Sequence, residues 1–304
     1  MRSALIGLAT SLATLALTQR LDKPPLEPSL DYLQKGLLEH LGSVKSSYKQ
    51  WGQGWIPADC KTMTEDANLS AADVETFNVQ YVDCPSDPWV LCRHKDSPDP
   101  LENMIDLFGR VPVGARQYVR HIINLPDPSM TSAYNSNGNI AMFDRINGDL
   151  TVFIHETGHS LDLLGAYPDK PLSSSSNWTA KYALDSHVPD PYSQTNKLED
   201  VAQNTVVAAY NLNVPGGFGS VEPKWREVQH QFGTIVGEQR VAGNLLVRGG
   251  TCVRRLANSK AVQAEGVSRV RRGLGKPPDV GLSDAVDVIE PVEFDTTEFC
   301  GRGS

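Results

Sequence analysis

The sequence predicts an α+β protein, and three observations support this fold class. Residues 151–164 (TVFIHETGHSLDLL) and 199–212 (EDVAQNTVVAAYNL) repeat apolar side chains at helical spacing. Residues 76–82 (TFNVQYV) and 117–125 (QYVRHIINL) are short runs of β-branched and aromatic residues, which are typical of strands. The chain of 304 residues is long enough to bury one large core or two modest cores. We therefore expect a sheet that packs against several helices.

The remaining elements follow from local signals along the chain. Helices are also predicted over residues 30–41, 101–108 and 225–240, and a further short strand over residues 140–143. Asp149 can cap the helix that contains residues 151–164, and Gly165 can end it. Residues 166–198 are rich in Pro, Ser, Asp and Asn, which predicts a long loop of the kind that often lines a site.

The two ends of the chain differ in composition from the middle. Residues 1–18 have the features of a secretory signal peptide: Arg2, an apolar run over residues 4–17 and small residues for cleavage. From residue 278 onward there are seven acidic residues and one basic residue, which predicts a solvated acidic tail. We therefore divide the chain into a signal peptide (1–18), one domain that carries the site (19–270) and an acidic C-terminal tail (271–304).

Charge and modification signals fit a secreted, soluble, extracellular protein. The formal net charge of the whole chain is −8, which argues against nucleic acid and anionic membranes as partners. Asn68-Leu-Ser70 and Asn177-Trp-Thr179 are acceptor triplets for N-glycosylation. We expect a monomer.

Five cysteines in an oxidising compartment should mostly form disulfides. They are Cys60, Cys84, Cys92, Cys252 and Cys300. Only the seven residues PSDPWVL separate Cys84 from Cys92, so we expect these two to pair across a local loop. One of the other three then stays free, bonds another chain or is lost by processing. Because no two cysteines have C-x₂₋₄-C spacing, a zinc site made of cysteines is not expected.

The run His155-Glu156-Thr157-Gly158-His159 is an H-E-x-x-H motif on the central predicted helix. Residues four apart lie on one helical face, so both imidazoles can reach a single metal ion. Two neutral imidazole nitrogens suit Zn²⁺, and a catalytic zinc needs one more protein ligand. The motif therefore predicts a metal site, with Glu156 beside the open coordination position.

The third ligand is not fixed by the motif itself. The candidates that follow are Asp162, Asp185, His187, Asp190, Glu199 and Asp200. A third histidine six residues past the second, as in metzincins, is excluded because position 165 is glycine. Glu199 is favoured, since it begins a second apolar helix that can hold a carboxylate rigidly. Asp200 should point away from the site, and His187 is the main competitor.

Two segments together resemble the lethal-factor-like zincins, a group of zinc metallopeptidases. The first is His155-Glu-Thr-Gly-His159-Ser-Leu-Asp162, and the second is Tyr192-Ser-Gln-Thr-Asn196-Lys-Leu-Glu199. They correspond to an H-E-x-G-H-x-x-D helix and a downstream Y-x₆-E segment, over about a fifth of the chain. The sequence is also similar to the conidiation-specific secreted proteins of filamentous fungi.

The resemblance implies a zincin-like fold, with a small mixed sheet over the active-site helix and a second helix that carries a ligand. It implies one Zn²⁺ per chain, held by His155, His159 and Glu199. It also implies Glu156 as general base and Tyr192 as a hydrogen-bond donor to the oxyanion. The expected function is a secreted zinc metallopeptidase that hydrolyses peptide bonds in proteins or peptides.

Three points stay open at this level. Asp162 either holds the ring of His159 or is a plain charge at the end of the helix. Lethal factor has an acid where this chain has Gln203, which weakens a supporting role for that position. The alternative function is a secreted cell-wall-associated or effector-like binding protein on a zincin scaffold, with little or no catalysis.

Overall fold

The structure is a computed structural model that describes residues 19–126, 133–143, 149–250, 252–264 and 287–289. The predicted signal peptide lies outside the described residues, as do Cys300 and most of the acidic tail. No helix within the described ranges is long and apolar enough to cross a bilayer.

Among the described residues, seven strands form one mixed sheet in the order β6-β7-β5-β4-β3-β1-β9. The strands of this sheet are β1 (Ser46–Gln50), β3 (Val74–Tyr81), β4 (Cys84–His94), β5 (His121–Leu125), β6 (Ala133–Ser136), β7 (Asn139–Phe143) and β9 (Asp287–Ile289). β5 runs parallel to both β4 and β7, whereas β6 pairs antiparallel with β7 at one edge. A separate pair joins β2 (Trp55–Pro57) to β8 (Ala261–Gln263).

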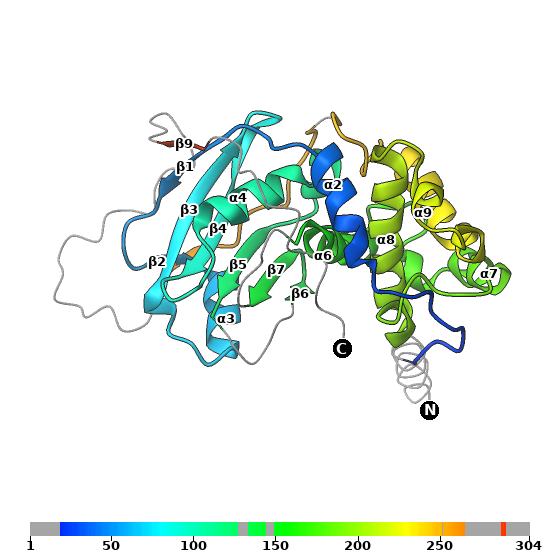
Figure 1. Cartoon of the computed structure of the whole chain (residues 1–304). Helices are drawn as coiled ribbons and strands as arrows, with labels where there is room; N and C mark the ends of the chain where they lie inside the picture. The colour runs from blue at the N-terminus through cyan, green and yellow to red at the C-terminus, as the bar shows by residue number, and fades with distance from the viewer. Residues whose placement is uncertain (1–18, 127–132, 144–148, 251, 265–286, 290–304) are drawn as a thin grey trace, which may run out of the picture.

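Helices cover both faces of the sheet and extend beyond one of its edges (Figure 1). The α-helices are α2 (Gln34–His40), α3 (Ala58–Asp66), α4 (Leu101–Arg110), α5 (Val113–Arg116), α6 (Leu150–Leu163), α7 (Ser176–Leu184), α8 (Lys197–Asn213) and α9 (Gln229–Val241). Short 3₁₀ turns are η1 (Leu30–Leu33), η2 (Ala71–Asp73), η3 (Leu172–Ser174), η4 (Ser193–Thr195), η5 (Phe218–Ser220) and η6 (Trp225–Glu227). α6 lies between the sheet and α8, and α8 packs on its other side against α9 (Figure 1).

The central strands are buried on both faces, which explains why β5 and β7 are almost continuously apolar. On one face, Leu91, Ile122 and Ile140 are in register and join the main core with α4 and α6. On the other face, Ile123 and Ala141 pack in a smaller core with residues of α3. The sheet therefore gives α6 a rigid apolar support.

Most predicted elements are confirmed, but residues 287–289 of the predicted solvated tail form strand β9, which pairs with β1, and three further differences occur. Residues 30–41, 101–108, 199–212 and 225–240 contain helices, and Gly165 follows α6 with a φ of +71°. The predicted strand 117–125 begins only at His121, because the chain still turns at residues 117–118 after α5, where Tyr118 N–H donates to the carbonyl of Ala115. The predicted loop 166–198 contains α7, whose Trp178 is fully buried, and the predicted loop between Cys84 and Cys92 is part of β4.

The expected Cys84–Cys92 disulfide is wrong, because the disulfides are Cys60–Cys92 and Cys84–Cys252. The two cysteines of β4 pair with Tyr81 and Thr76 of β3, five residues apart and thus separated by about 17 Å along that strand. A disulfide needs Cα atoms within about 7 Å. Cys84 and Cys92 also belong to the cores on opposite faces of the sheet.

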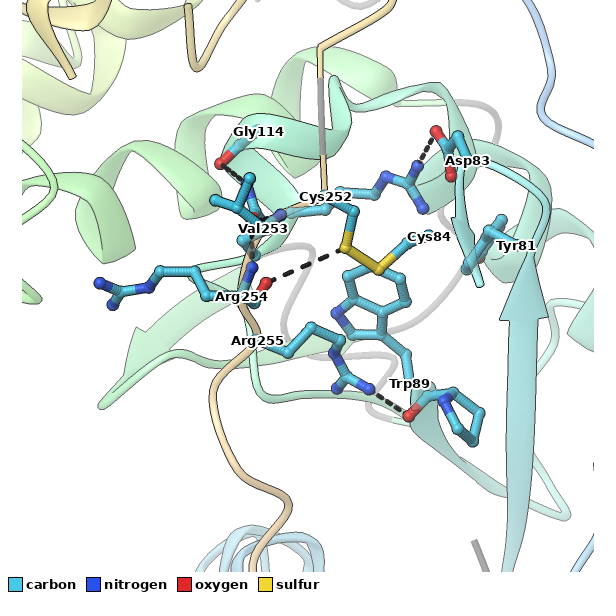
Figure 2. The surroundings of a disulfide bond; sticks show 12 residues. Tyr81, Asp83, Cys84, Trp89, Gly114, Cys252, Val253, Arg254 and Arg255 are labelled. Carbon is cyan, nitrogen blue, oxygen red and sulfur yellow. Dashed lines mark hydrogen bonds and ion pairs between the residues drawn. A yellow bond between two sulfur atoms is a disulfide. The ribbon is translucent and has the colours of Figure 1, made fainter. Parts of the chain in front are cut away.

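The disulfide of Cys252 fastens the start of the segment 252–264 to Cys84, the first residue of β4 (Figure 2). The backbone N–H groups of Val253 and Arg254 both donate to Gln117 Oε1, at 2.7 Å each. The guanidinium of Arg255 lies 4.2 Å from the ring centre of Trp89. Segment 252–264 then ends in β8, so it is held at both ends.

Replacing Cys84 and Cys252 together by alanine should lower the free energy of unfolding by about 2–5 kcal/mol. The reason is that this disulfide joins residues 168 positions apart, so it restricts the unfolded chain strongly. Urea unfolding of both proteins measures the change. Peptide mapping without reduction is the control, and a peptide linked through Cys84 and Cys92 would contradict the structure.

Candidate metal centre

α6 presents the two histidines of the motif on one face. Asp149 occupies the N-cap position of the helix without a side-chain cap hydrogen bond, and Leu150–Leu163 runs for 14 residues through the motif. The rings of His155 and His159 lie edge to face, with centroids 4.8 Å apart. Both residues are mostly buried, which limits their movement.

Glu199 comes from the first turn of α8, and the start of that helix fixes its position. Asn196 caps α8: its Oδ1 accepts hydrogen bonds from the N–H groups of Leu198 (2.8 Å) and Glu199 (3.1 Å). This interaction satisfies donors that have no partner inside a helix. The backbone of Glu199 is therefore fixed by a hydrogen bond within the first turn of α8, independently of any contact with α6.

His155, His159 and Glu199 converge at one point between the two helices. Glu199 Oε2 lies 3.1 Å from His155 Nε2 and 3.2 Å from His159 Nε2. One potential ligand atom from each residue lies within 4.8 Å of the others, and within the described ranges no other group of three such residues does so. Glu199 lies 40 positions after His159 in the sequence, so two separate helices build a single three-atom cluster.

This convergence depends on a close approach of α6 and α8 at Gly158. A Cβ atom at Gly158 would lie 3.0 Å from Cβ of Thr205 and 3.1 Å from Cα of Ala202. The second contact is with backbone, which cannot rotate away. A side chain at position 158 would therefore need α8 to shift by a few tenths of an ångström, whereas glycine allows the separation at which the carboxylate of Glu199 lies close to both imidazoles.

Glu156 lies next to this cluster and is almost fully buried. Its Oε2 atom has no hydrogen-bond partner among the described residues. Burial raises the pKa of Glu156, although the nearby His155 and His159 oppose this effect. A carboxylate in this setting takes up a proton more readily than an exposed one.

The electrostatics of Glu199 are opposite to those of Glu156. Burial alone would raise the pKa of Glu199, but hydrogen bonds from His155 and His159 outweigh it and lower this pKa to about 2. Burial alone would also lower the pKa of His155, but the hydrogen bond and charge of Glu199 and the charge of Glu156 raise it. The cluster therefore attracts positive charge.

Tyr192 lies at the open side of the cluster. Its ring centre is 5.5 Å from that of His155, and 51% of the residue is exposed. Partial burial, together with the charges of Glu199 and Glu156, raises the pKa of Tyr192 to about 12. The phenol therefore keeps its proton near neutral pH and can donate a hydrogen bond.

The other acidic and imidazole candidates lie in separate interactions. His187 Nδ1 pairs with Glu227 Oε2 at 2.7 Å. Asp185 accepts hydrogen bonds from His230 and Gln231 of α9, and Asp200 also contacts Gln231, on the far side of α8. Asp200 thus points away from the cluster, as predicted.

Asp162 and Gln203 differ from the sequence-based expectations. Asp162 is neither a plain charge at a helix end nor a hydrogen-bond partner of His159. It is buried, its Oδ1 accepts from the N–H of Ser173 (3.0 Å), which anchors the chain after α6, and its Oδ2 has no hydrogen-bond partner among the described residues. Gln203 Oε1 lies 3.1 Å from His155 Nδ1, so this position supports a motif histidine although it is not an acid. Only the helical register of α8, which puts Gln203 one turn after Glu199, could have indicated this role.

The donor atoms fit a zinc ion better than a harder cation. In a tetrahedral zinc site with bonds of about 2.0–2.1 Å, neighbouring ligand atoms are about 3.3–3.4 Å apart. The separations of 3.1 and 3.2 Å from Glu199 Oε2 are close to this value. Two imidazoles and one carboxylate also match catalytic zinc sites, whereas Mg²⁺ and Ca²⁺ prefer oxygen ligands.

Comparison with known proteins places the cluster within a family segment. The sequence profile described as conidiation-specific protein Con-13 matches residues 29–222. Conidiation-specific protein 13 of Neurospora crassa is 34% identical over 182 residues, which are 59% of this chain and 53% of that protein. The chain therefore spans about half the length of the curated relative that it matches. No solved structure matches the chain.

Replacing Gly158 by alanine should lower the free energy of unfolding by about 1–3 kcal/mol, because the added methyl group would push α8 away from α6. Gly237→Ala is the matched control, since Gly237 lies in α9 and a Cβ there meets no atom within 4 Å. That variant should gain about 0.5–1 kcal/mol from the better helix former. Equal effects in thermal or urea unfolding would rule out a special packing requirement at Gly158.

Proposed function

The chain belongs to the conidiation-specific protein Con-13 family, and since that name states no reaction, we propose a function from its own site: a secreted, zinc-dependent metallopeptidase. The observation that carries the proposal is the convergence of His155, His159 and Glu199 beside the buried carboxylate of Glu156. A zincin-like arrangement is part of the same proposal, supported by the motif helix and the second ligand helix packed together.

His155, His159 and Glu199 would hold one zinc ion through two Nε2 atoms and one carboxylate oxygen. When bound, zinc supplies a Lewis acid that makes a water molecule nucleophilic near neutral pH. The low pKa of Glu199 keeps this ligand ionised over the whole physiological range. The mostly buried imidazoles limit the geometry that the site can adopt.

Glu156 and Tyr192 would carry the proton transfer and the charge stabilisation. Glu156 would accept a proton from the attacking water and pass it to the leaving amine, which its raised pKa favours. Tyr192 would donate a hydrogen bond to the oxyanion of the tetrahedral intermediate, from the open side of the cluster. Hydrolysis of a peptide bond uses an activated water, a proton transfer to the leaving amine and stabilisation of the oxyanion. Proteins or peptides are therefore the proposed substrate class.

The first test of the proposal is metal content. Wild-type protein, purified without chelators, should contain about one zinc per chain by elemental mass spectrometry. Glu199→Ala should lose it or bind it much more weakly, since one of three ligands is removed. His187→Ala is the matched control and should keep its zinc, because His187 pairs with Glu227 instead. Zinc retained in Glu199→Ala and lost in His187→Ala would assign the third ligand to His187.

The second test is chelator-sensitive cleavage of casein or a peptide library. Glu156→Gln should lower kcat/KM by about 10²–10⁴-fold, because the amide cannot accept the proton. Glu65→Gln, an exposed change on α3, should leave the rate unchanged. A zinc-loaded wild type without cleavage would favour the binding-protein function, and unchanged activity in Glu156→Gln would exclude the general-base mechanism.

A further inference from the structure

A chain of hydrogen bonds runs from His155 into the protein interior. Gln203 Oε1 is 3.1 Å from His155 Nδ1, and Gln203 Nε2 donates to Asp190 Oδ2 at 2.7 Å. Asp190 is only 1% exposed and lies two residues before Tyr192. Asp190 was a candidate for the third ligand in the sequence, but it lies outside the group of His155, His159 and Glu199 and interacts with Gln203 instead.

The partners of Asp190 determine how the amide of Gln203 is oriented. Asp190 Oδ1 accepts from both the N–H and the hydroxyl of Ser193, at 2.8 Å each, and Leu30 N–H is 3.5 Å from Oδ2. The N–H groups of Ser193 and Leu30 can only donate, so both carboxylate oxygens act as acceptors. The group of Gln203 that faces Asp190 must therefore be the NH₂ group, and its carbonyl oxygen faces His155.

The orientation of Gln203 in turn determines which nitrogen of His155 carries the proton. A carbonyl oxygen is only an acceptor, so His155 Nδ1 must carry a hydrogen to interact with it. Nε2, which faces Glu199, is then the nitrogen that would give up its hydrogen and offer its lone pair to a metal ion. Asp190 also holds Ser193, the residue that follows Tyr192, and thereby fixes the segment that carries the phenol.

We propose that Asp190 and Gln203 are a positioning pair: together they fix the Nδ1 proton of His155 and hold the Tyr192 segment against the same ring. This inference rests on the proposed function, in which Nε2 of His155 binds zinc. One buried carboxylate thus sets both the ligand nitrogen of His155 and the place of the predicted oxyanion donor.

The pair can be tested by exchanging its donor and acceptor. In Asp190→Asn an amide faces an amide. The new carbonyl oxygen should stay with the buried N–H of Ser193, so the new NH₂ group faces Gln203, which should turn its own NH₂ group toward His155 Nδ1. Zinc affinity should fall about tenfold to a hundredfold. In the double variant with Gln203→Glu, the new amide at position 190 can donate to the new carboxylate at position 203. The second oxygen of that carboxylate can then accept the hydrogen of His155 Nδ1. The double variant should therefore recover most of the lost affinity.

Two measurements separate the possible outcomes. Zinc affinity is measured by competition with a chelator, and the ring ¹⁵N–¹H resonance of His155 Nδ1 is followed in histidine-labelled protein. The resonance should be present in wild type and in the double variant, and absent in Asp190→Asn. Affinity and resonance unchanged in Asp190→Asn, or no recovery in the double variant, would overturn the positioning role.

The controls keep this test independent of the proposed function. Gln50 and Glu75 form an exposed amide–carboxylate pair on β1 and β3, and their exchange (Gln50→Glu with Glu75→Gln) should leave zinc affinity unchanged. Thermal unfolding shows whether each variant is folded. A wild type that binds no zinc but shows the predicted Nδ1 resonances would overturn the proposed function while supporting the positioning pair.

Discussion

The contact between α6 and α8 at Gly158 is the constraint on which the rest of the site depends. The carboxylate of Glu199 reaches two imidazoles on another helix, and the helices must be close because a glutamate side chain is short. Asn196 fixes the start of α8, so the backbone of Glu199 cannot adjust alone. The same approach brings Gln203, one turn further along, within hydrogen-bond distance of His155. A wider separation would lose both contacts at once.

The features that could be predicted from sequence are those determined by residues near one another in the chain. The H-E-x-x-H spacing places His155 and His159 on one face whatever the surroundings. The apolar periodicity of residues 199–212 likewise predicts a helix with Glu199 on its packed face. The arrangement of the sheet goes beyond such local features. Its strand order, β6-β7-β5-β4-β3-β1-β9, depends on pairings between segments that are distant in sequence. No local pattern specifies that order.

The incorrect predictions concern features that depend on contacts between segments distant in sequence. Cys84 and Cys92 are close in sequence, but β4 is extended and directs them into cores on opposite faces, so each finds a distant partner. The polar composition of residues 166–198 hid α7, whose stability depends on burying Trp178 rather than on an apolar stripe. The role of Gln203 was underestimated because the expectation was an acid. A carbonyl oxygen accepts the Nδ1 hydrogen just as an acid would, provided that another group, here Asp190, fixes the amide.

Glu156 and Glu199 are two carboxylates of one site with opposite shifts in pKa, and the difference has an identifiable cause. Burial raises the pKa of both, so burial cannot distinguish them. Glu199 accepts hydrogen bonds from two imidazoles, which stabilise its charge, whereas Glu156 Oε2 has no such partner within the described part of the chain. A permanently ionised carboxylate is suited to hold a cation, and a carboxylate with a raised pKa is suited to take up and release a proton. The positions of two histidine rings therefore account for opposite pKa shifts in two identical side chains.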